Sequence, residues 1–585
     1  MIKLFKNINL KEWIMILICL ILVFIQVWLE LKMPDYMSQI TILLQGEGSK
    51  INDILIKGGY MLLCAFGSLI SAIITIFILT IISSKFAQRL RRKVFSKTLN
   101  ISTAEVKNFS VSSLITRTTN DVNQVEMFLS MGIMLLFKAP ITAIWGIRKI
   151  LNKSWQWSVL SARAVVIILI TIGVIVSIVM PRFSIVQKLI DKVNRVIREN
   201  LTGIRVIRAF NAEKYQENKF NTQNKKLTDT QLFNQRCFAI LHPVMQMVMN
   251  LLTLGIYFIG AILIKDSIMV NKLTLFGDMV VFSSYAIQII MSFVMLSMIH
   301  MILPRANVSA KRINEVLETE SSIKYGNFSG NTSERGVVEF KNVSFKYPDA
   351  DDYLLENISF KAEKGQTIAF IGSTGSGKST LINLVPRFYD ATEGEVLVDG
   401  VNVKDYLQEA LNNKLGYVSQ KAVMFDGTVK SNVTYGKSKK KITDEKVKEA
   451  IKVAQAQDFI LKMDKTYDSH IASRGTNISG GQKQRISIAR AIAKDPEIYI
   501  FDDSFSALDY KTDAILRKEL KKYTKEATTL IVAQRIGTIL NADKIIVLDN
   551  GKVVGSGTHK ELLNTCDVYK EIAYSQLSRK ELENA

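Results

Sequence analysis

Eight residues beginning at Gly372 have the types and the spacing needed to bind nucleotide phosphates. The stretch reads GSTGSGKS and matches the phosphate-loop pattern G-x-x-x-x-G-K-[ST] without a gap. Its glycines let successive backbone N–H groups converge on phosphate oxygens. Lys378 is expected to reach the β- and γ-phosphates, and the Ser379 hydroxyl to ligate Mg²⁺. The predicted ATP-binding residues here are Gly372, Ser373, Thr374, Gly375, Ser376, Gly377, Lys378, Ser379 and Thr380.

The residues on either side of this loop supply the context that the pattern requires. Thr367–Ile371 is short, apolar and partly β-branched, which indicates a buried strand, and Thr380–Leu384 can open a helix. A helix beginning at the loop directs its positive end toward the phosphates. Farther along, the apolar run Pro496–Phe501 predicts a second strand that ends in Asp502 and Asp503. A carboxylate at a strand end beside the phosphate loop is where Mg²⁺ is held, and we assign that role to Asp502.

A second device for binding phosphate precedes that strand. It consists of a serine, two glycines and a glutamine at the start of a predicted helix over 486–493: Ser479, Gly480, Gly481 and Gln482. The hydroxyl, the glycine amides and the helix N-terminus suit an anion. The loop beginning at Gly372 already binds this chain's own nucleotide, so the Ser479–Gln482 motif has no phosphate to bind in that site.

Length and composition indicate which elements hold these residues in place. At 585 residues the chain is too long for one hydrophobic core, so at least two domains are expected. Hydrophobic residues make up 48% of the chain and its mean hydropathy is +0.17, which is high for a wholly soluble protein. Four scattered cysteines and only four histidines make a disulfide framework or a histidine-based metal site improbable.

The N-terminal half contains six apolar runs long enough to cross a bilayer, which takes about 20 residues each. An even number of spans puts both chain ends on the same side. The predicted spans lie near 13–31, 59–83, 127–151, 158–180, 240–264 and 276–303.

Basic residues identify that side. The segment 182–236 carries twelve Lys/Arg against five Asp/Glu, and 84–126 is similarly basic. An excess of Lys and Arg marks cytoplasmic loops, so we expect both termini and the nucleotide-binding part in the cytoplasm. The net charge of +22 is then largely a signal of topology, and no nucleic-acid partner is expected.

The two basic segments have helical periodicity, which predicts that the membrane helices extend into the cytoplasm. We expect a short transverse helix to cap each extension, around Asn108–Thr118 and around Thr202–Glu213. The alternative is a pair of solvated hairpins with no further role.

Charged residues inside the spans need an explanation, because each costs about 2.5–3.5 kcal/mol at the centre of a membrane helix. Lys138 lies in the middle of the third span, and Arg148 and Arg163 lie nearer the outer side. One interpretation is snorkelling or internal pairing, for instance with Glu30 or Asp278. The other is a cationic lining for an amphiphile with an acidic group.

The composition changes sharply after the last span. Residues 318–336 are polar, rich in Ser, Gly and Asn, and without sustained periodicity, which is typical of a linker. We therefore predict a transmembrane domain over 1–317 and a nucleotide-binding domain over 337–585.

Several of these motifs together resemble the ATP-binding cassette (ABC) proteins. Ser479–Gln482 resembles their signature, with Ile478 where leucine is usual, and Ser506–Asp509 resembles the loop that crosses between paired cassettes. Tyr347 stands at the position of the aromatic residue that stacks on adenine. Gln420 stands at that of the glutamine that meets Mg²⁺ and the transmembrane domain.

The membrane half resembles the six-helix ABC exporter type, through stretches such as Glu199–Asn211, so the resemblance covers about residues 13–574. It implies a membrane all-α six-helix exporter bundle with cytoplasmic helical extensions, followed by an α/β P-loop ABC ATPase domain. It also implies that the transverse helices are coupling helices seated on the cassette.

In that family each ATP site forms between the phosphate loop of one cassette and the signature of another, so a dimer is implied. Two departures indicate its kind. Asp503 replaces the family's catalytic glutamate, and Gln534 replaces its switch histidine. Aspartate is one methylene shorter than glutamate, which can leave it out of reach of the water that a general base must contact. Glutamine cannot carry the proton or the positive charge that a histidine can. The chain thus resembles the degenerate-site subunit of bacterial heterodimeric multidrug ABC exporters.

The function implied is ATP-driven export across the bacterial plasma membrane, with a different half-transporter as partner and ATP and Mg²⁺ as cofactors. A hydrophobic small molecule, a lipid and a peptide all remain open as substrate. Two alternatives also remain: an ATP-binding regulatory or sensing subunit, and a homodimeric lipid or peptide exporter.

Overall fold

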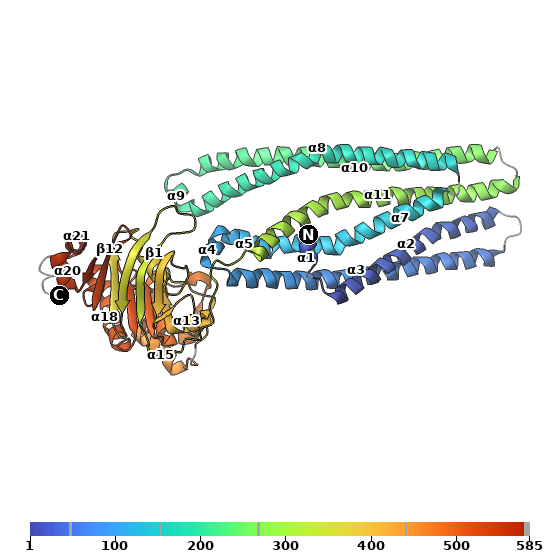
Figure 1. Cartoon of the computed structure of the whole chain (residues 1–585). Coiled ribbons are helices and arrows are strands. Elements are labelled where there is room, and N and C mark those ends of the chain that lie inside the picture. The colour runs from blue at the N-terminus through green and yellow to red at the C-terminus, as the bar shows by residue number, and fades with distance from the viewer. Residues whose placement is uncertain (7, 46–49, 152–153, 266–268, 439–440, 578–585) are drawn as a thin grey trace. The chain divides into compact units, whose positions relative to one another are not determined.

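The computed structural model describes residues 1–6, 8–45, 50–151, 154–265, 269–438 and 441–577 (Figure 1). The chain divides into two compact units, and each is described by itself. Unit 1 comprises residues 1–99 and 111–318, and unit 2 comprises residues 100–110 and 319–585.

Unit 1 is entirely helical in its described part. Six of its helices, or near-continuous helical stretches, are long and apolar enough to cross a membrane, and each contains one predicted span. The prediction of six apolar helices is therefore confirmed. The helices of unit 1 are α1 (Ile2–Phe5), α2 (Leu10–Gln45), α3 (Ile51–Asn100), α5 (Val111–Thr118), α6 (Asn120–Met127), the π-turn η1 (Phe128–Gly132), α7 (Ile133–Leu151), α8 (Trp155–Thr202), α9 (Ile204–Ala209), α10 (Glu213–Lys265) and α11 (Met269–Glu318).

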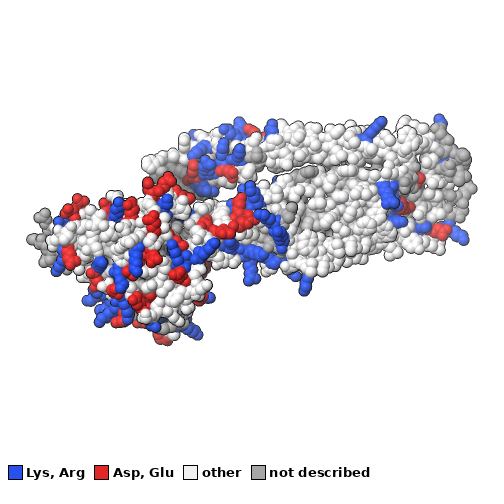
Figure 2. Space-filling model, in the orientation of Figure 1, with Lys and Arg blue, Asp and Glu red and all other residues white. Residues whose placement is uncertain are grey.

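The long helices exceed what a bilayer requires. At 1.5 Å per residue, the 50 residues of α3 extend about 75 Å, against a hydrocarbon core of about 30 Å. The basic ends of α3, α8 and α10 are continuous with their apolar parts, as predicted. On the face shown in Figure 2, a long stretch of unit 1 is almost free of charged side chains, as a surface that faces lipid must be.

Buried polar groups join the membrane helices to one another. The Trp157 indole N–H of α8 donates to the carbonyl of Ile256 in α10, at 3.1 Å. The Tyr285 hydroxyl of α11 lies 2.8 Å from the Leu31 carbonyl and 2.6 Å from an Asp35 carboxylate oxygen, both in α2. Both aromatic side chains are at most 1% exposed, and their hydrogen bonds join α8 to α10 and α11 to α2.

Ion pairs account for part of the charge within the spans. Lys138 of α7 lies 2.9 Å from Glu30 of α2, and Lys149 lies 2.6 Å from Asp35. Of the two interpretations, these contacts support internal pairing for Lys138, because a carboxylate in an adjacent helix balances its charge. Arg148 and Arg163 are exposed in the single chain.

Short helices occur at both places where transverse helices were expected. α9 lies within Thr202–Glu213, and α5 lies within Asn108–Thr118. An additional short helix, α4 (Thr103–Asn108), precedes α5 and belongs to unit 2. Its Glu105 carboxylate accepts a hydrogen bond from the Ser322 backbone N–H at 3.2 Å, and Ala104 packs against a buried cluster of the cassette. The helix α4, which belongs to the cassette unit, therefore lies just before the segment Asn108–Thr118 in which a transverse helix was predicted.

Unit 2 is an α/β domain with two principal sheets. A six-stranded sheet has the order β12-β11-β3-β10-β9-β6 and is parallel except for β12, and an antiparallel sheet has the order β2-β1-β4-β5. The strands are β1 (Val338–Phe345), β2 (Leu355–Ala362), β3 (Thr367–Gly372), β4 (Glu393–Val398), β5 (Val401–Asn402), β6 (Leu415–Val418), β7 (Gly427–Thr428), β8 (His470–Ile471), β9 (Ile498–Asp502), β10 (Thr528–Val532), β11 (Lys544–Asp549) and β12 (Lys552–Gly557).

Helices flank these sheets, and side chains alternate between two hydrophobic clusters across the parallel sheet. In β10, Ile531 joins one cluster and its neighbours Leu530 and Val532 join the other, as in a strand buried on both faces. The helices of unit 2, besides α4, are α12 (Lys378–Asn383), α13 (Gln408–Lys414), α14 (Val429–Val433), α15 (Asp444–Val453), α16 (Gln457–Ile460), α17 (Gly480–Lys494), α18 (Tyr510–Tyr523), α19 (Ile536–Ile539), α20 (His559–Thr565) and α21 (Asp567–Gln576).

Candidate nucleotide-binding site

The predicted site residues gather at one edge of the parallel sheet. β3, β9 and β10 run side by side in the same direction, so their carboxyl ends meet at that edge. The phosphate loop follows β3, Asp502 and Asp503 end β9, and Gln534 follows β10. Ligands of open parallel sheets bind beyond this edge.

The phosphate loop needs glycine because its backbone approaches neighbouring chain closely. A Cβ at Gly372 would overlap the carbonyl of Leu548, and one at Gly377 would lie 2.6 Å from the Leu355 side chain. Gly377 also has φ +91° and forms the N-cap of α12. The loop therefore turns directly from strand into helix, and the helix N-terminus faces the site.

Lys378 curls back over the loop that it follows. Its ammonium donates to the carbonyls of Gly372 at 2.9 Å and Ser373 at 2.6 Å. Burial lowers the pKa of this ammonium, although Asp503 and Asp502 act in the opposite sense. A buried cation held by carbonyl oxygens has a clear gain in free energy if phosphate oxygens replace them.

Two of the expected Mg²⁺ ligands are in direct contact. The Ser379 hydroxyl donates to an Asp502 carboxylate oxygen at 2.6 Å. Burial raises the pKa of Asp502, and the Ser379 hydrogen bond partly offsets that effect. A hydroxyl and a carboxylate side by side are oxygen donors of the kind Mg²⁺ takes alongside phosphate oxygens.

Asp503 is the centre of a second polar cluster. The side-chain amides of Gln534 and Gln420 both donate to its Oδ2 atom, at 2.8 Å and 3.2 Å. Asp503 has φ +47°, a left-handed conformation that is strained for a residue with a side chain. Burial raises the pKa of this carboxyl. Gln420 thus contacts Asp503, and the hydrogen bond we find for it does not involve Asp502.

The predicted adenine-stacking residue belongs to an aromatic group. The Tyr347 ring lies edge-on to the rings of Phe345 and Tyr389, with centroids 5.0 Å and 5.3 Å away. The Tyr347 and Thr380 hydroxyls share a hydrogen bond of 2.9 Å, which ties the aromatic residue to the phosphate-loop helix.

Lys107 of α4 joins this aromatic group, which sequence reasoning did not find. Its ammonium lies 5.4 Å from the centre of the Tyr347 ring and 5.3 Å from that of Tyr389. Both distances are within the range of a cation–π interaction. In the sequence, Lys107 is one of several basic residues in 84–126, and nothing local distinguishes it.

The second phosphate-binding device starts helix α17. Ser479 is the N-cap: its hydroxyl accepts from the Gln482 backbone N–H at 3.3 Å, and the Gln482 side chain accepts from the Ser479 backbone N–H at 2.9 Å. Ser479 and Gly480 are exposed. The Ser479–Gln482 motif is therefore ordered and accessible, and both hydrogen bonds join residues at the start of α17.

Gln576 is a second residue that the sequence analysis did not find, and it forms hydrogen bonds with two backbone groups of the segment after β10. The Gln576 side chain in α21 accepts from the Ile536 N–H and donates to the Gln534 carbonyl, both at 2.8 Å. Arg535 also donates to the Ser506 carbonyl at 3.1 Å. Because Gln576 is distant in the sequence and matches no motif, only the fold reveals this contact.

Comparison with known proteins identifies a membrane region followed by an ATP-binding region. Residues 16–293 match the family model "ABC transporter transmembrane region", and residues 355–506 match "ABC transporter". An uncharacterized ABC transporter ATP-binding protein of Mycobacterium tuberculosis is 38% identical over 523 residues, which are 88% of this chain and 87% of that protein.

Two further comparisons concern export. A putative multidrug export ATP-binding/permease protein of Staphylococcus aureus is 33% identical over 492 residues, with 84% of each chain covered. The structure of a bacterial Atm1-family ABC exporter with ATP bound has a TM-score of 0.78 at 24% identity and covers 96% of this chain and 98% of its own. At that identity the structural likeness concerns the fold.

Proposed function

This chain belongs to the ABC transporter family as an exporter half with its own ATPase domain, and we propose that it pairs with a different half-transporter to export a hydrophobic or amphiphilic compound. In this proposal its own ATP site is degenerate: it holds ATP and Mg²⁺ but hydrolyses slowly. The chain also completes the partner's site, where most of the hydrolysis takes place.

The observation that carries this proposal is the pair of glutamine amides on one oxygen of Asp503. A general base must come within hydrogen-bond reach of the water from which it takes a proton. Here Gln534 and Gln420 both use Oδ2, and the short aspartate side chain keeps the carboxylate close to the backbone. Gln534 also has no titratable proton, so it cannot act as a histidine would. The cluster of Asp503, Gln534 and Gln420 is therefore better suited to holding bound ATP than to taking a proton from the attacking water.

ATP binding itself does not require Asp503 or Gln534, the two residues that differ from the family pattern. The loop amides and Lys378 would hold the phosphates, while Ser379 and Asp502 would hold Mg²⁺, which neutralises phosphate charge. The Tyr347 ring would stack on adenine. These residues fit the nucleotide because ammonium, hydroxyl and carboxylate groups already meet around the loop.

The signature supports a role toward a partner. Ser479 and Gly480 are accessible, and α17 presents its N-terminus behind them, so an anion supplied from outside the domain would meet N–H groups and a positive helix end. Under the proposal that anion is the γ-phosphate of ATP on the partner's phosphate loop. ATP binding would then close the cassettes, and hydrolysis at the partner's loop would reset the membrane helices.

A relative and the surface of the spans indicate the substrate class. The Staphylococcus aureus relative is named as a putative multidrug exporter, and the spans here carry mainly apolar surface. We therefore propose a drug-like amphiphile, transported out of the cytoplasm across the plasma membrane of a bacterium, with both termini cytoplasmic.

The test is reconstitution in inverted vesicles with a half-transporter of the same bacterium that carries the catalytic glutamate and the switch histidine. ATP-dependent uptake of a cationic fluorescent dye by the mixed dimer, and little uptake by either chain alone, is expected. Full uptake by this chain alone would contradict the heterodimer and favour a homodimeric exporter. ATPase activity of the mixed dimer with no movement of dyes, lipids or peptides would favour a sensing subunit instead.

A further inference from the structure

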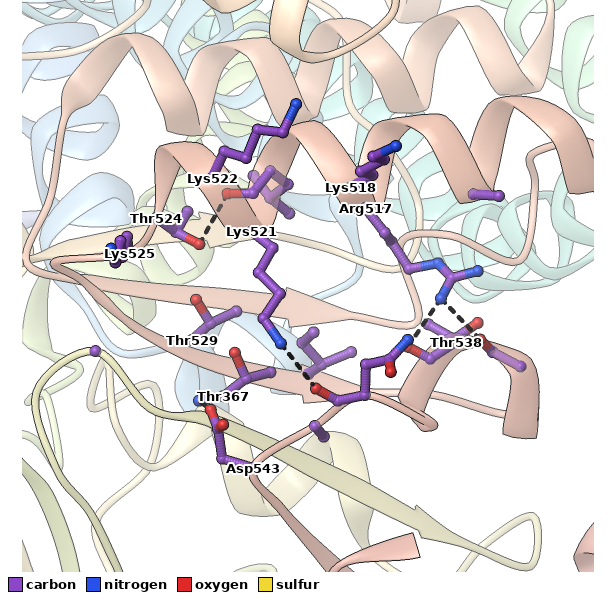
Figure 3. Close-up of a pocket in the computed structure, with 17 residues that line it drawn as sticks. Thr367, Arg517, Lys518, Lys521, Lys522, Thr524, Lys525, Thr529, Thr538 and Asp543 are labelled. Carbon is purple, nitrogen blue, oxygen red and sulfur yellow. Dashed lines mark hydrogen bonds between the residues drawn. The ribbon is translucent and has the colours of Figure 1, made fainter. Parts of the chain in front are cut away.

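A cavity of about 780 Å³ lies in unit 2 at the edge of the parallel sheet where β3 and β10 begin (Figure 3). Thr367 is the first residue of β3, and Thr529 is the second of β10. The phosphate loop follows the other end of β3, so the cavity lies at the opposite edge of the sheet from the ATP site. Its volume is within the usual range for small-molecule sites, about 300–1,000 Å³.

The side of the cavity formed by α18 and the turn after it is strongly basic. Figure 3 shows Arg517 and Lys521 reaching from the helix toward the strand side, and Lys522 pointing away. Five of the residues lining the cavity are cationic: Arg517, Lys518, Lys521, Lys522 and Lys525.

Two of these charges are already balanced by carboxylates. Arg517 lies 3.0 Å from Asp513, one helical turn earlier, and also donates to the Gly537 carbonyl at 2.7 Å. Lys522 lies 2.9 Å from Glu519. Both carboxylates belong to α18, as the two cations do, so these pairs add no net charge to the cavity.

The other three ammonium groups have no carboxylate within 4 Å in the part of the chain that the structure describes. Lys521 makes one hydrogen bond, to the Asn541 carbonyl at 3.3 Å, and keeps two of its three donors. The ammonium groups of Lys518 and Lys525 have no hydrogen-bond partner among the described residues, and both residues line the cavity. The one carboxylate that lines the cavity, Asp543, accepts the backbone N–H of Thr367 at 2.7 Å. The cavity therefore has a net positive charge.

The floor of the cavity is different in character. Leu520, Ile531 and Ala542 are buried there and offer apolar surface. Thr529 is only 3% exposed, and its hydroxyl oxygen has no hydrogen-bond partner among the described residues. A buried hydroxyl without a partner is costly, by about 1–3 kcal/mol, and a ligand oxygen reaching the floor would supply the missing partner.

We propose that this cavity binds a small organic anion that carries two or more negative charges on an apolar body. Three unbalanced lysines would attract the charges, and the apolar floor would receive the body. The cavity contains no glycine loop to cradle phosphate with backbone amides, so recognition depends on side-chain charge, and sulfonate, carboxylate or phosphate groups would serve alike. The site is separate from the ATP site and does not depend on the proposed partner.

The test uses pyranine, a fluorescent pyrene trisulfonate, and the full chain purified in a non-ionic detergent. Binding is followed by fluorescence anisotropy at low ionic strength, with excess Mg²⁺–ATP present to occupy the nucleotide site. Saturable binding is expected, and the double variant Lys518→Glu/Lys525→Glu should weaken it about tenfold or more, since two of the three unbalanced charges are reversed. Loss of the signal when ATP is added would overturn the proposal, because the probe would then be in the nucleotide site.

Two matched variants separate a cavity from general surface charge. Lys448→Glu/Lys462→Glu makes the same change in charge at exposed positions elsewhere in unit 2 and should leave pyranine binding unchanged. Ala514→Phe fills the cavity without changing charge and should weaken binding by a similar factor to the Lys518/Lys525 variant. Equal weakening by the Lys448/Lys462 variant, or unaltered binding by Ala514→Phe, would show that the probe follows surface charge and would overturn the proposal.

Discussion

At the scale of single residues, Asp503 and Ser479 illustrate two different tasks on one chain. Asp503 is buried, strained and bonded by two amides, whereas Ser479 is exposed and caps a helix whose N-terminus is accessible. Under the proposed function, Asp503 belongs to this chain's own nucleotide site. Ser479 would bind a phosphate of the ATP on the partner's cassette.

This division predicts an order of effects in the reconstituted heterodimer. Ser479→Ala should depress ATPase severely, because it disturbs the partner's hydrolysing site. Asp503→Asn should cost little, since general-base catalysis, worth about 10²–10⁴-fold, would come from the partner's glutamate. Steady-state ATPase of both variants is the measurement. If Asp503→Asn abolishes turnover as completely as Ser479→Ala, then Asp503 is a working base and the degenerate-site proposal is wrong.

The raised pKa of Asp503 predicts a pH-dependent stability. Because burial raises this pKa above its usual value of 3.8, the folded state binds the proton more tightly than the unfolded state does. Stability from this group is thus fully present below pH 3.8 and is lost as pH rises through the folded pKa. Asp503→Asn should therefore stabilise the nucleotide-free protein at pH 7, by about 2–4 °C in Tm for each kcal/mol recovered.

Thermal unfolding of the full chain in detergent, measured from pH 4 to pH 7.5, checks this. The gain from Asp503→Asn should shrink toward pH 4, and the exposed control Asp351→Asn should show no such trend. A gain that is constant with pH would mean that the carboxyl does not titrate in this window.

At the scale of elements, α4 brings a basic residue to the aromatic group of the cassette. It lies between α3 and α5 in the sequence, yet it packs with the cassette, and its Lys107 lies over two aromatic rings of which one is the predicted adenine-stacking residue. A short helix of six residues has little stability of its own, so its tertiary contacts hold it in place.

Removing that charge should weaken ATP binding by the chain. A cation–π interaction at an exposed site is worth about 0.5–1 kcal/mol, so Lys107→Met is expected to reduce ATP affinity by about two- to fivefold. Isothermal titration with ATP measures the change, and Lys85→Met, at an exposed position of α3, is the control. Tighter binding by Lys107→Met would mean instead that the lysine competes with adenine for the Tyr347 ring.

The other short helix, α9, leads to a prediction about coupling. Arg205 and Arg208 are exposed on it, while Ile207 between them is buried. If α9 seats on a cassette, Arg205→Glu/Arg208→Glu should leave ATP binding intact while substrate-stimulated ATPase and transport fall together. Undiminished stimulation in this variant would remove these arginines from the path of transmission.

At the scale of the whole molecule, the chain combines a membrane unit with one cassette. The phosphate loop and the signature lie on the same cassette, but the signature's hydrogen bonds remain within α17. Under the proposed function, a second cassette completes the ATP site, and the departures at Asp503 and Gln534 are the reason for proposing a partner with a different sequence.

The purified chain alone should accordingly bind ATP but hydrolyse it slowly. Adding the partner should raise turnover by a factor within the general-base range, about 10²–10⁴-fold. Lys378→Ala in the mixed dimer should give an intermediate loss, because it weakens the ATP that holds the cassettes closed. Rapid hydrolysis by this chain alone, at rates that the partner does not increase, would contradict the asymmetric dimer.

Local patterns were sufficient to predict much of this protein. The six spans depend on runs of about 20 apolar residues, and the phosphate loop depends on a strand, a glycine turn and a helix that follow one another directly, so both are written in contiguous residues. The parallel sheet then brings Asp502 to Ser379, a contact expected from the order of the motifs along the chain.

Contacts between distant segments were decided only by the tertiary structure. Whether Lys138 pairs or lines a path depends on Glu30, which is 108 residues away in another helix, and the packing of two helices determines which charges meet. For the same reason the sequence predicted a short helix around Asn108–Thr118, where α5 lies, but not the additional helix α4, which is stabilised by Ser322 and the cassette's hydrophobic cluster. Lys107, Gln576 and the basic cavity beneath α18 likewise have no local pattern, because each is formed by side chains that the fold alone brings together.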